Sequence, residues 1–324
     1  LGMRRVKVGF VGAGVHAVAV HYPSLAMMRD VEIAAVCDLK EERVRLVRAK
    51  FGVKKGYRDY RRMLSEEDLD AVYVITPPHQ LYDIVADVLE MGLNVFIEKP
   101  PGVTRFQIES LARIAERNKC ITMVGFNRRF IPLLRVAREA VMEEGEINTC
   151  VAEFHKYYPE SLAYYRGAVD ILTCDAIHAV DVLRWICGEH RRVLSIVKRF
   201  GRPYENGFYA LIEFEGGRVG VLLADWASGG RVHRFELHTM GASAYVDPDD
   251  KALIYKDGSL KAVISTQEAA GSDDRVIYYG FYHENRHFID CVKEGREPEI
   301  SFREAVKTMK LVENIYREAL RLDN

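Results

Sequence analysis

The stretch of sequence that most restricts the fold is VKVGFVGAGVHA, residues 6–17, which joins an apolar strand pattern to a glycine-rich turn. A buried strand that turns at glycines into a helix is typical of the start of a Rossmann domain. In that arrangement Gly12 permits the tight turn, Gly14 lets a pyrophosphate approach the backbone, and Ala17 allows close packing of helix on strand. We therefore predict a dinucleotide site here; a glycine turn with only a structural role is the alternative.

The residues around this turn indicate which dinucleotide binds. Val15 and His16 begin the following helix, whose free amides and positive dipole end favour a phosphate. The second strand pattern ends at Cys37, and Asp38 follows it, where an acid bonds the ribose hydroxyls and repels a 2′-phosphate. The sequence thus predicts NAD as the cofactor and disfavours NADP.

Residues 1–126 alternate between strand and helix patterns, which predicts a doubly wound parallel sheet with right-handed crossovers. The short β-branched runs are typical of strands buried on both faces. Strands are expected at 6–12, 32–37, 71–76, 94–98 and 121–126, and helices at 15–29, 41–51, 59–65, 80–91 and 104–118.

The pattern changes after about residue 127, where helices are followed by alternating strands with glycine turns between them. We predict a second domain over 127–324, an α+β domain with an open, mostly antiparallel sheet. Ser301 and Glu304 have the spacing of a capping box at the start of the last helix. Helices are expected at 132–144, 175–187, 280–294 and 301–321, strands at 208–214, 218–226, 234–240, 243–247 and 252–258, and turns at 215–217 and 256–258.

Charge and composition restrict the partners. The 324 residues include 46 Lys and Arg against 47 Asp and Glu, so the net charge of −1 gives no general attraction to nucleic acid or anionic membranes. No run approaches the ~20 apolar residues of a membrane helix, and the first residues show no signal-peptide pattern. Six scattered cysteines without a CxxC pair predict reduced thiols. We expect a cytoplasmic protein with a small-molecule partner.

The motif IEKPPG, residues 97–102, follows the fourth strand pattern at the edge where such sheets bind ligands. Pro100 and Pro101 restrict Lys99 to an extended backbone and so present it in a fixed direction. A lysine beside the cofactor could stabilise developing alkoxide charge on a substrate. An ordinary surface lysine next to a Pro-Pro turn fits the pattern equally well.

Several motifs occur in one order along nearly the whole chain. They are the glycine turn, TPPHQ (76–80), EKP (98–100), VGFNRRFIP (124–132), HAVDVLRWICG (178–188) and HFIDCVKEGREPEIS (287–301). This ordered set resembles the glucose–fructose oxidoreductase / inositol dehydrogenase / MocA-type (Gfo/Idh/MocA) oxidoreductase family, and it is far more specific than any single motif.

The resemblance implies NAD(P)-dependent oxidation or reduction of sugars, cyclitols or related compounds. It also implies subunit contacts through the open sheet, and hence a homodimer or homotetramer. By the same resemblance Lys99 matches the catalytic lysine and His178 the catalytic histidine. The positions expected to contact the cofactor are Gly12, Gly14, Val15, His16, Asp38, Thr76, Pro77, His79, Glu98, Lys99 and Asn127.

Two positions depart from the family pattern. Leu81 stands five residues after Thr76, where much of the family has a histidine. Cys174 stands four residues before His178, where the family often has a catalytic aspartate, and Asp175 comes one residue later. Positions three and four residues back lie on roughly the same side of a helix, so Asp175 could still serve with altered geometry.

A helical rotation of about 100° per residue separates two sides of the segment CDAIHAVD. The polar side is expected to face a cleft or an interface, with His178 relaying the proton, Lys99 polarising the substrate oxygen and Asp175 orienting the imidazole. Asp181 is expected to bond backbone or Arg184. A metal site needs three or more convergent ligands, and we predict none; a hydrogen-bonded core histidine is the other alternative. The polar side comprises Cys174, Asp175, His178, Asp181 and Trp185, and the apolar side Ile177, Val180, Leu183 and Cys187.

Two functions are therefore considered. The first is an NAD-dependent oxidoreductase that acts on a secondary alcohol of a sugar, sugar acid or cyclitol. The second is a catalytically silent NAD(P)-binding regulator or scaffold of the same fold. Lys99 and His178 favour the enzyme, whereas Cys174 favours the regulator.

Overall fold

The computed structural model describes residues 4–320, and these fold as two compact units. The first contains the chain up to Asn127 together with Phe281–Val306, and the second contains Arg128–Gly280 and the chain from Lys307 onward. The segment Phe281–Val306 thus belongs to the first unit, whereas the sequence placed all of 127–324 in a second domain. Packing of a late helix on early strands leaves no local signal in the sequence.

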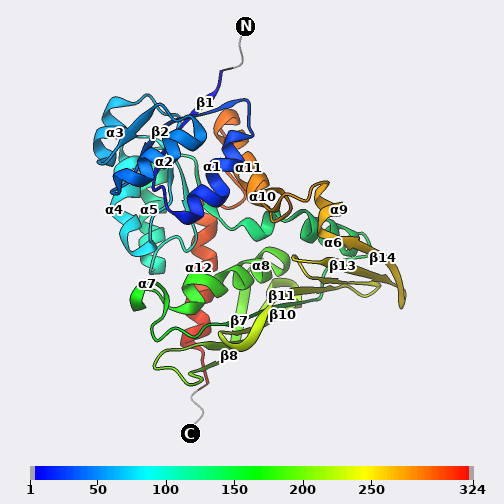
Figure 1. Ribbon diagram of the computed structural model, residues 1–324. Coiled ribbons are helices and arrows are strands. Elements are labelled where there is room, and N and C mark those ends of the chain that lie inside the picture. The colour runs from blue at the N-terminus through cyan, green and yellow to red at the C-terminus, as the bar shows by residue number, and fades with distance from the viewer. Residues whose placement is uncertain (1–3, 321–324) are drawn as a thin grey trace. The chain divides into compact units, whose positions relative to one another are not determined.

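The first unit, in which Figure 1 labels β1 and β2, is built on a six-stranded parallel sheet with the strand order β3-β2-β1-β4-β5-β6. This is the order of a doubly wound dinucleotide-binding sheet, as predicted. The short strand β3 was not foreseen. The strands are β1 (Val6–Val11), β2 (Val31–Cys37), β3 (Lys55–Tyr57), β4 (Ala71–Val74), β5 (Asn94–Glu98) and β6 (Thr122–Gly125).

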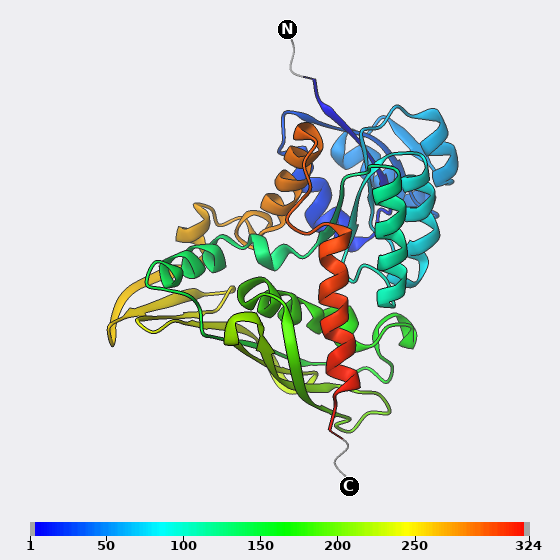
Figure 2. The same cartoon turned by 180° about the vertical axis from the view of Figure 1, so that it is seen from behind.

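The helices of the first unit alternate with these strands, and Figure 2 shows α4 and α5 packed side by side. The Thr104 side chain caps α5 by accepting a hydrogen bond from the Gln107 N–H. Contacts group α1 with α2 and α11, and α4 with α3 and α5. The helices are η1 (Ala17–His21), α1 (Tyr22–Ala26), α2 (Glu41–Phe51), α3 (Tyr60–Glu66), η2 (Pro78–Gln80), α4 (Leu81–Glu90), α5 (Arg105–Arg117), α11 (Phe281–Glu294) and the start of α12 (Phe302–Arg317).

An aromatic stack holds the central strands of the first unit together. Phe10, Tyr73 and Phe96 occupy matching register positions on β1, β4 and β5. Their ring centroids are 4.8 Å apart for Phe10 and Tyr73 and 4.7 Å apart for Tyr73 and Phe96. All three side chains are fully buried. The stack lies just before the strand ends, so it fixes the residues that follow each strand.

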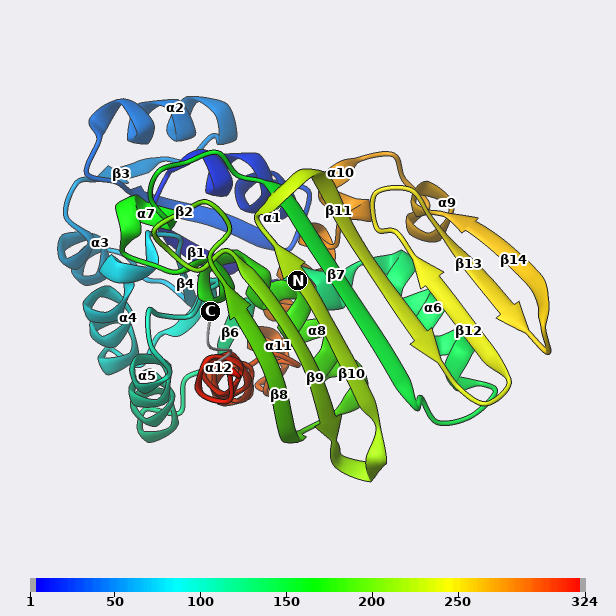
Figure 3. The ribbon, with the colours of Figure 1, turned by 90° about the horizontal axis from the view of Figure 1, so that it is seen from below.

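The second unit contains an eight-stranded sheet with the order β14-β13-β12-β11-β7-β10-β9-β8, drawn side by side in Figure 3. All neighbours are antiparallel except β7 and β10, which are parallel. The central strand β7 was not predicted from the sequence. The strands are β7 (Thr149–Tyr157), β8 (His190–Lys198), β9 (Gly207–Phe214), β10 (Val219–Asp225), β11 (Ala227–His238), β12 (Ala242–Val246), β13 (Lys251–Lys256) and β14 (Ser259–Ser265).

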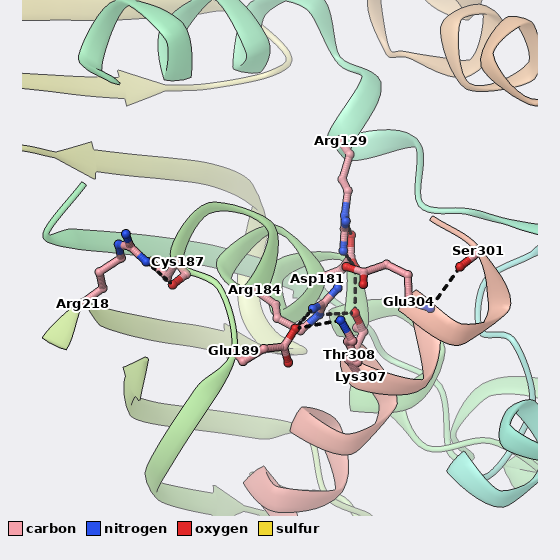
Figure 4. Close-up of polar contacts among 10 residues, drawn as sticks. All are labelled: Arg129, Asp181, Arg184, Cys187, Glu189, Arg218, Ser301, Glu304, Lys307 and Thr308. Atoms are coloured by element: carbon pink, nitrogen blue, oxygen red, sulfur yellow. Dashed lines mark hydrogen bonds and ion pairs between the residues drawn. The ribbon is translucent and has the colours of Figure 1, made fainter. Parts of the chain in front are cut away.

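Helix α8 covers one face of this sheet through contacts with β7 and β10. Every second residue of β7, namely Cys150, Ala152 and Phe154, is buried beneath it. The predicted cap at Ser301 is confirmed, because its hydroxyl accepts the Glu304 N–H at 3.3 Å (Figure 4). The helices of this unit are η3 (Asn127–Phe130, which begins at the last residue of the first unit), α6 (Pro132–Met142), α7 (Tyr164–Gly167), η4 (Leu172–Ala176), α8 (Ile177–Cys187), η5 (Glu215–Gly217), α9 (Thr266–Ala270), α10 (Arg275–Tyr278) and the rest of α12.

The observed architecture confirms the predicted fold class, a parallel Rossmann sheet plus a second, mostly antiparallel sheet. Within residues 4–320 no helix is both long enough and apolar enough to span a bilayer.

Candidate active site

The glycine turn after β1 has the geometry that the sequence predicted. Gly12 has a φ of +114°, and a Cβ atom there would lie 2.2 Å from the Ile75 carbonyl oxygen, so only glycine fits. The Gly12 N–H donates to the Cys37 carbonyl at 2.8 Å. A Cβ on Gly14 would meet nothing closer than an Arg43 nitrogen at 3.9 Å. The turn is therefore fixed by Gly12 and open at Gly14.

Asp38 lies beside this turn, at the end of β2. Its Oδ2 accepts the Ala13 N–H at 2.8 Å, and its Oδ1 accepts the Lys40 N–H at 2.9 Å. The Arg43 guanidinium lies 3.8 Å from Oδ2. The carboxylate is thus held against the glycine turn, at the position expected for the group that bonds the ribose.

The motif after β4 brings a buried hydroxyl to the same edge of the sheet. Thr76 Oγ1 is buried and has no hydrogen-bond partner within residues 4–320. Leaving such a group unsatisfied costs ~1–3 kcal/mol, which a ligand that supplies the missing bond would offset. Pro77 precedes η2, and His79 in η2 is exposed. Leu81, which replaces the family's histidine, is 2% exposed and packs in the core.

Glu98, the last residue of β5, joins three elements of the first unit. Its Oε1 lies 2.8 Å from His21 Nε2 and 2.9 Å from His16 Nε2. Its Oε2 accepts the Lys99 N–H at 3.0 Å. Burial would raise the pKa of Glu98, but the two histidines outweigh burial and hold that pKa well below its usual range. Glu98 is therefore an ionised carboxylate.

His21 is fully buried, and burial lowers its pKa against the opposing effect of Glu98. Its imidazole is thus neutral near pH 7 and approaches Glu98 through Nε2. Asn285 of α11 lies against the other ring nitrogen, Nδ1. No local pattern in the sequence connects residues 21, 98 and 285.

Lys99 follows this anchored carboxylate, and its peptide bond to Pro100 is cis. Its side chain is half-buried. Asn127, the last residue of the first unit, is 1% exposed and follows β6. The first unit thus places the predicted cofactor residues after the carboxyl ends of β1, β2, β4, β5 and β6, along one edge of the parallel sheet.

The helix that carries His178 is buried almost all round, which corrects the expectation of an apolar side and a polar side facing a cleft or an interface. Residues 177–184 are all buried, including His178 at 2% exposure and Asp181 at 0%. The preceding segment η4 is a π-helix, in which i→i+5 hydrogen bonding lowers the rotation per residue. The assumed 100° per residue therefore fails for Cys174 and Asp175, both of which are buried.

Asp181 is held by an arginine of the motif VGFNRRFIP. Its carboxylate accepts Arg129 Nε at 2.7 Å and Nη2 at 2.6 Å, and also the Thr308 hydroxyl at 2.8 Å (Figure 4). Arg184 instead donates to Thr308 and to Glu189. Asp181 thus bonds Arg129 and Thr308, whereas backbone or Arg184 was expected. Arg129 and Asp181 lie 52 positions apart in the sequence, so no local pattern reveals that they pair.

Asp175 lies in a different polar cluster of the second unit. Its Oδ2 accepts hydrogen bonds from the Lys156 ammonium and from the Tyr164 hydroxyl, the latter at 2.8 Å. Trp226 Nε1 donates to the same hydroxyl at 3.0 Å. Burial, followed by the charge of Asp175, raises the pKa of Tyr164. The sequence did not identify Lys156; an alternating pattern around residue 154 was the signal that could have placed it on a strand.

Comparisons with known proteins identify the family of this chain. The family profile "Oxidoreductase family, NAD-binding Rossmann fold" matches residues 6–126, and the Gfo/Idh/MocA C-terminal domain profile matches residues 135–245. The chain is 25% identical to a myo-inositol 2-dehydrogenase of Thermotoga maritima, over 91% of each protein. It is also 25% identical to a D-apiose dehydrogenase of Paraburkholderia graminis, over 98% of this chain and 88% of that one.

A solved structure of a dehydrogenase from Chromobacterium violaceum superimposes with a TM-score of 0.88 at 26% identity. The match covers 98% of this chain and 96% of that one. The chain belongs to the Gfo/Idh/MocA oxidoreductase family. It is an NAD-dependent oxidoreductase, and the open glycine turn, the fixed Asp38 carboxylate and the unsatisfied Thr76 hydroxyl fit that cofactor.

Proposed function

We propose that this protein is an NAD-dependent dehydrogenase that interconverts a secondary alcohol and a ketone on a sugar, sugar acid or cyclitol. Relatives named for inositol and apiose, both polyhydroxylated, support this substrate class. Bound NAD supplies the acceptor for hydride. The chain supplies the groups that bind the cofactor and control the hydroxyl proton.

The proposal gives Lys99 the role of polarising the substrate oxygen. The observation that carries it is the anchoring of this lysine, whose N–H donates to Glu98 while Glu98 is held by two histidines. A fixed backbone reduces the reorganisation needed to bring an ammonium to a developing alkoxide. Its position after β5, at the cofactor edge of the sheet, is where such a charge acts.

His178 is proposed to relay the proton of the substrate hydroxyl, and Asp175 to favour the protonated imidazole. His178 lies on the rigid, buried helix α8. Asp175 lies in η4, which leads directly into α8, and it bonds Lys156 and Tyr164. The Lys156 ammonium and the Tyr164 hydroxyl would hold the Asp175 carboxylate in a fixed position, although Cys174 stands where the family usually has an aspartate.

Asp38 is proposed to accept the ribose hydroxyls and to exclude a 2′-phosphate. Its two oxygens already hold the Ala13 and Lys40 amides, so the carboxylate cannot turn away from the glycine turn. We expect NAD to bind more tightly than NADP. Tighter binding of NADP would contradict this role.

The direct experiment measures NADH absorbance during incubation with a panel of polyols, sugars and sugar acids. Lys99→Ala is expected to lower kcat by ~10²–10³-fold, a larger effect than on NAD affinity, because the main lost interaction is made in the transition state. Lys99→Arg, which keeps the charge, is the matched control and should retain more activity than the alanine variant. Full turnover by Lys99→Ala would refute the mechanism.

A silent NAD-binding regulator is the second candidate, and one observation favours it. Cys174 replaces the family's usual acid, and Asp175 is engaged with Lys156 and Tyr164. Tight NAD binding without turnover on the whole panel would support the regulator and contradict the enzyme.

We also propose that the open sheet of the second unit forms subunit contacts. Leu194 and Leu211 on β8 and β9 are each 51% exposed, and Val263 on β14 is 53% exposed. These side chains give the sheet exposed apolar area. Light scattering should show a homodimer or homotetramer, and Leu211→Glu should shift it toward the monomer.

A further inference from the structure

Within residues 4–320 one set of three histidine and carboxylate side chains converges on a common point. The set comprises His16, His21 and Glu98, whose ligand atoms all lie within 4.8 Å of one another. All three belong to the first unit, beside the glycine turn and the end of β5. No metal site was predicted from the sequence, in which Glu98 lies 77 positions after His21.

A π-helix brings the two histidines together. His21 stands five positions after His16, and on an α-helix this spacing would turn the two side chains well apart. Here the turn is closed by an i→i+5 hydrogen bond from the Tyr22 N–H to the Ala17 carbonyl. The two imidazoles therefore lie on one face, with ring centroids 5.5 Å apart.

The carboxylate and the buried imidazole are already oriented as ligands. The Lys99 N–H holds Glu98 Oε2, so Oε1 faces the two Nε2 atoms at 2.8 and 2.9 Å. Asn285 Nδ2 donates to the Phe281 carbonyl, and the Asn285 Oδ1 and Nδ2 atoms lie 3.3 and 3.2 Å from His21 Nδ1. When a metal displaces the Nε2 proton, the Oδ1 atom can accept a proton carried by Nδ1, as outer partners of metal-bound histidines do.

We propose that His16, His21 and Glu98 form a binding site for one divalent transition-metal ion of the Zn²⁺ type. Two imidazole nitrogens and one carboxylate oxygen are a ligand set that Zn²⁺ accepts while keeping an open fourth position. His16 is 49% exposed, so its ring can move to the ~2.0–2.1 Å coordination distance without disturbing the core. The site goes beyond the proposed hydride transfer, which needs no metal ion.

The test titrates tag-free, cofactor-free protein with Zn²⁺ against a chromophoric chelator and with Co²⁺ in the visible range. We expect one ion per chain, a Co²⁺ spectrum of a four-coordinate site, and a rise in Tm with added Zn²⁺. His16→Ala and His16→Gln should each weaken binding at least about tenfold. His16→Gln retains a donor for Glu98, so its loss of binding would report the lost ligand and not the lost hydrogen bond.

The matched control is His238→Ala in the second unit. His238 also lies beside a carboxylate, at 3.4 Å from Glu236, but it does not belong to the convergent set. This variant should bind Zn²⁺ as the unmodified protein does. Equal Zn²⁺ binding by the unmodified protein and His16→Ala, or no binding by either, would overturn the proposal. Because no readout depends on turnover, failure of the proposed dehydrogenase activity would leave this result unaffected.

Discussion

Asp175 and Asp181 stand six residues apart in one helical segment, yet their surroundings differ. Asp181 is fully enclosed and pairs in bidentate fashion with Arg129, which is 2% exposed. Asp175 bonds Lys156, whose side chain is 26% exposed, and a tyrosine hydroxyl. An enclosed bidentate pair fixes structure, whereas a buried acid whose partner lysine is partly exposed keeps a link to solvent and ligands through that lysine. Asp181 should therefore govern stability and Asp175 activity.

The largest expected effect is on Asp181. Asp181→Asn should lower the free energy of unfolding by ~3–5 kcal/mol, because it leaves the Arg129 guanidinium buried without its carboxylate. Denaturant unfolding of the two proteins measures the difference. Activity per folded molecule should remain close to that of the unmodified enzyme.

The double variant Arg129→Met/Asp181→Leu is the control for this prediction. Removing both charges leaves no uncompensated ion, so it should cost less stability than Asp181→Asn. A loss below ~1 kcal/mol for Asp181→Asn would show that the pair does not act as a structural link.

Asp175→Asn should reduce activity more than stability, the reverse of what is expected for Asp181→Asn. We expect kcat to fall about hundredfold, equivalent to ~2.7 kcal/mol, with a smaller loss of unfolding free energy than Asp181→Asn causes. Steady-state kinetics on the best substrate of the panel measures the first effect. Cys174→Ala is the matched control at the position of the family's usual acid, and it should keep its turnover. Loss of activity in Cys174→Ala but not in Asp175→Asn would reverse the assignment.

A third acid extends the comparison to the first unit. The pKa of Asp30 is lowered to about 2, chiefly by its hydrogen bonds with Arg286. Burial opposes this shift, and the hydrogen bond from Lys293 adds to it. The unfolded value is ~3.9, so this stabilisation is complete above about pH 4 and is lost as the pH falls through about 2. Asp30→Asn should cost ~2 kcal/mol of unfolding free energy at pH 7 and much less at pH 2.5.

Asp290→Asn is the control for Asp30, because it contacts the same Arg286 but is more exposed. Its cost should stay below ~1 kcal/mol. A loss for Asp30→Asn that did not diminish between pH 4 and pH 2 would contradict the ion-pair explanation.

The smallest expected effect concerns Thr76, whose buried hydroxyl has no partner in the described chain. Thr76→Val should weaken NAD binding about tenfold, ~1.4 kcal/mol, while Tm stays the same or rises. Thr76→Ser keeps the hydroxyl and should retain affinity. Calorimetric titration with NAD distinguishes the two variants. Unchanged NAD affinity in Thr76→Val would show that Thr76 does not contribute to cofactor binding.

The sequence alone determined much of the first unit. The glycine turn, the acid after the second strand and the EKP turn are local patterns, because each depends on backbone conformation or on residues adjacent along the chain. Gly12 illustrates this: its positive φ follows from a tight turn at a strand end, whereas its contact with Ile75 depends on β4 lying beside β1. Apart from the short strand β3, the predicted order of strands and helices in residues 4–126 was confirmed for the same reason.

The tertiary structure decided which polar groups meet. Arg129 with Asp181, Lys156 with Asp175, and His21 with Glu98 and Asn285 are joined by packing over long stretches of chain. Two π-helices also changed the rotation that an α-helical wheel assumes, at His16–His21 and at Cys174–Asp175. The sequence specified the residues that carry the chemistry, but burial and long-range packing assigned each of them its partner.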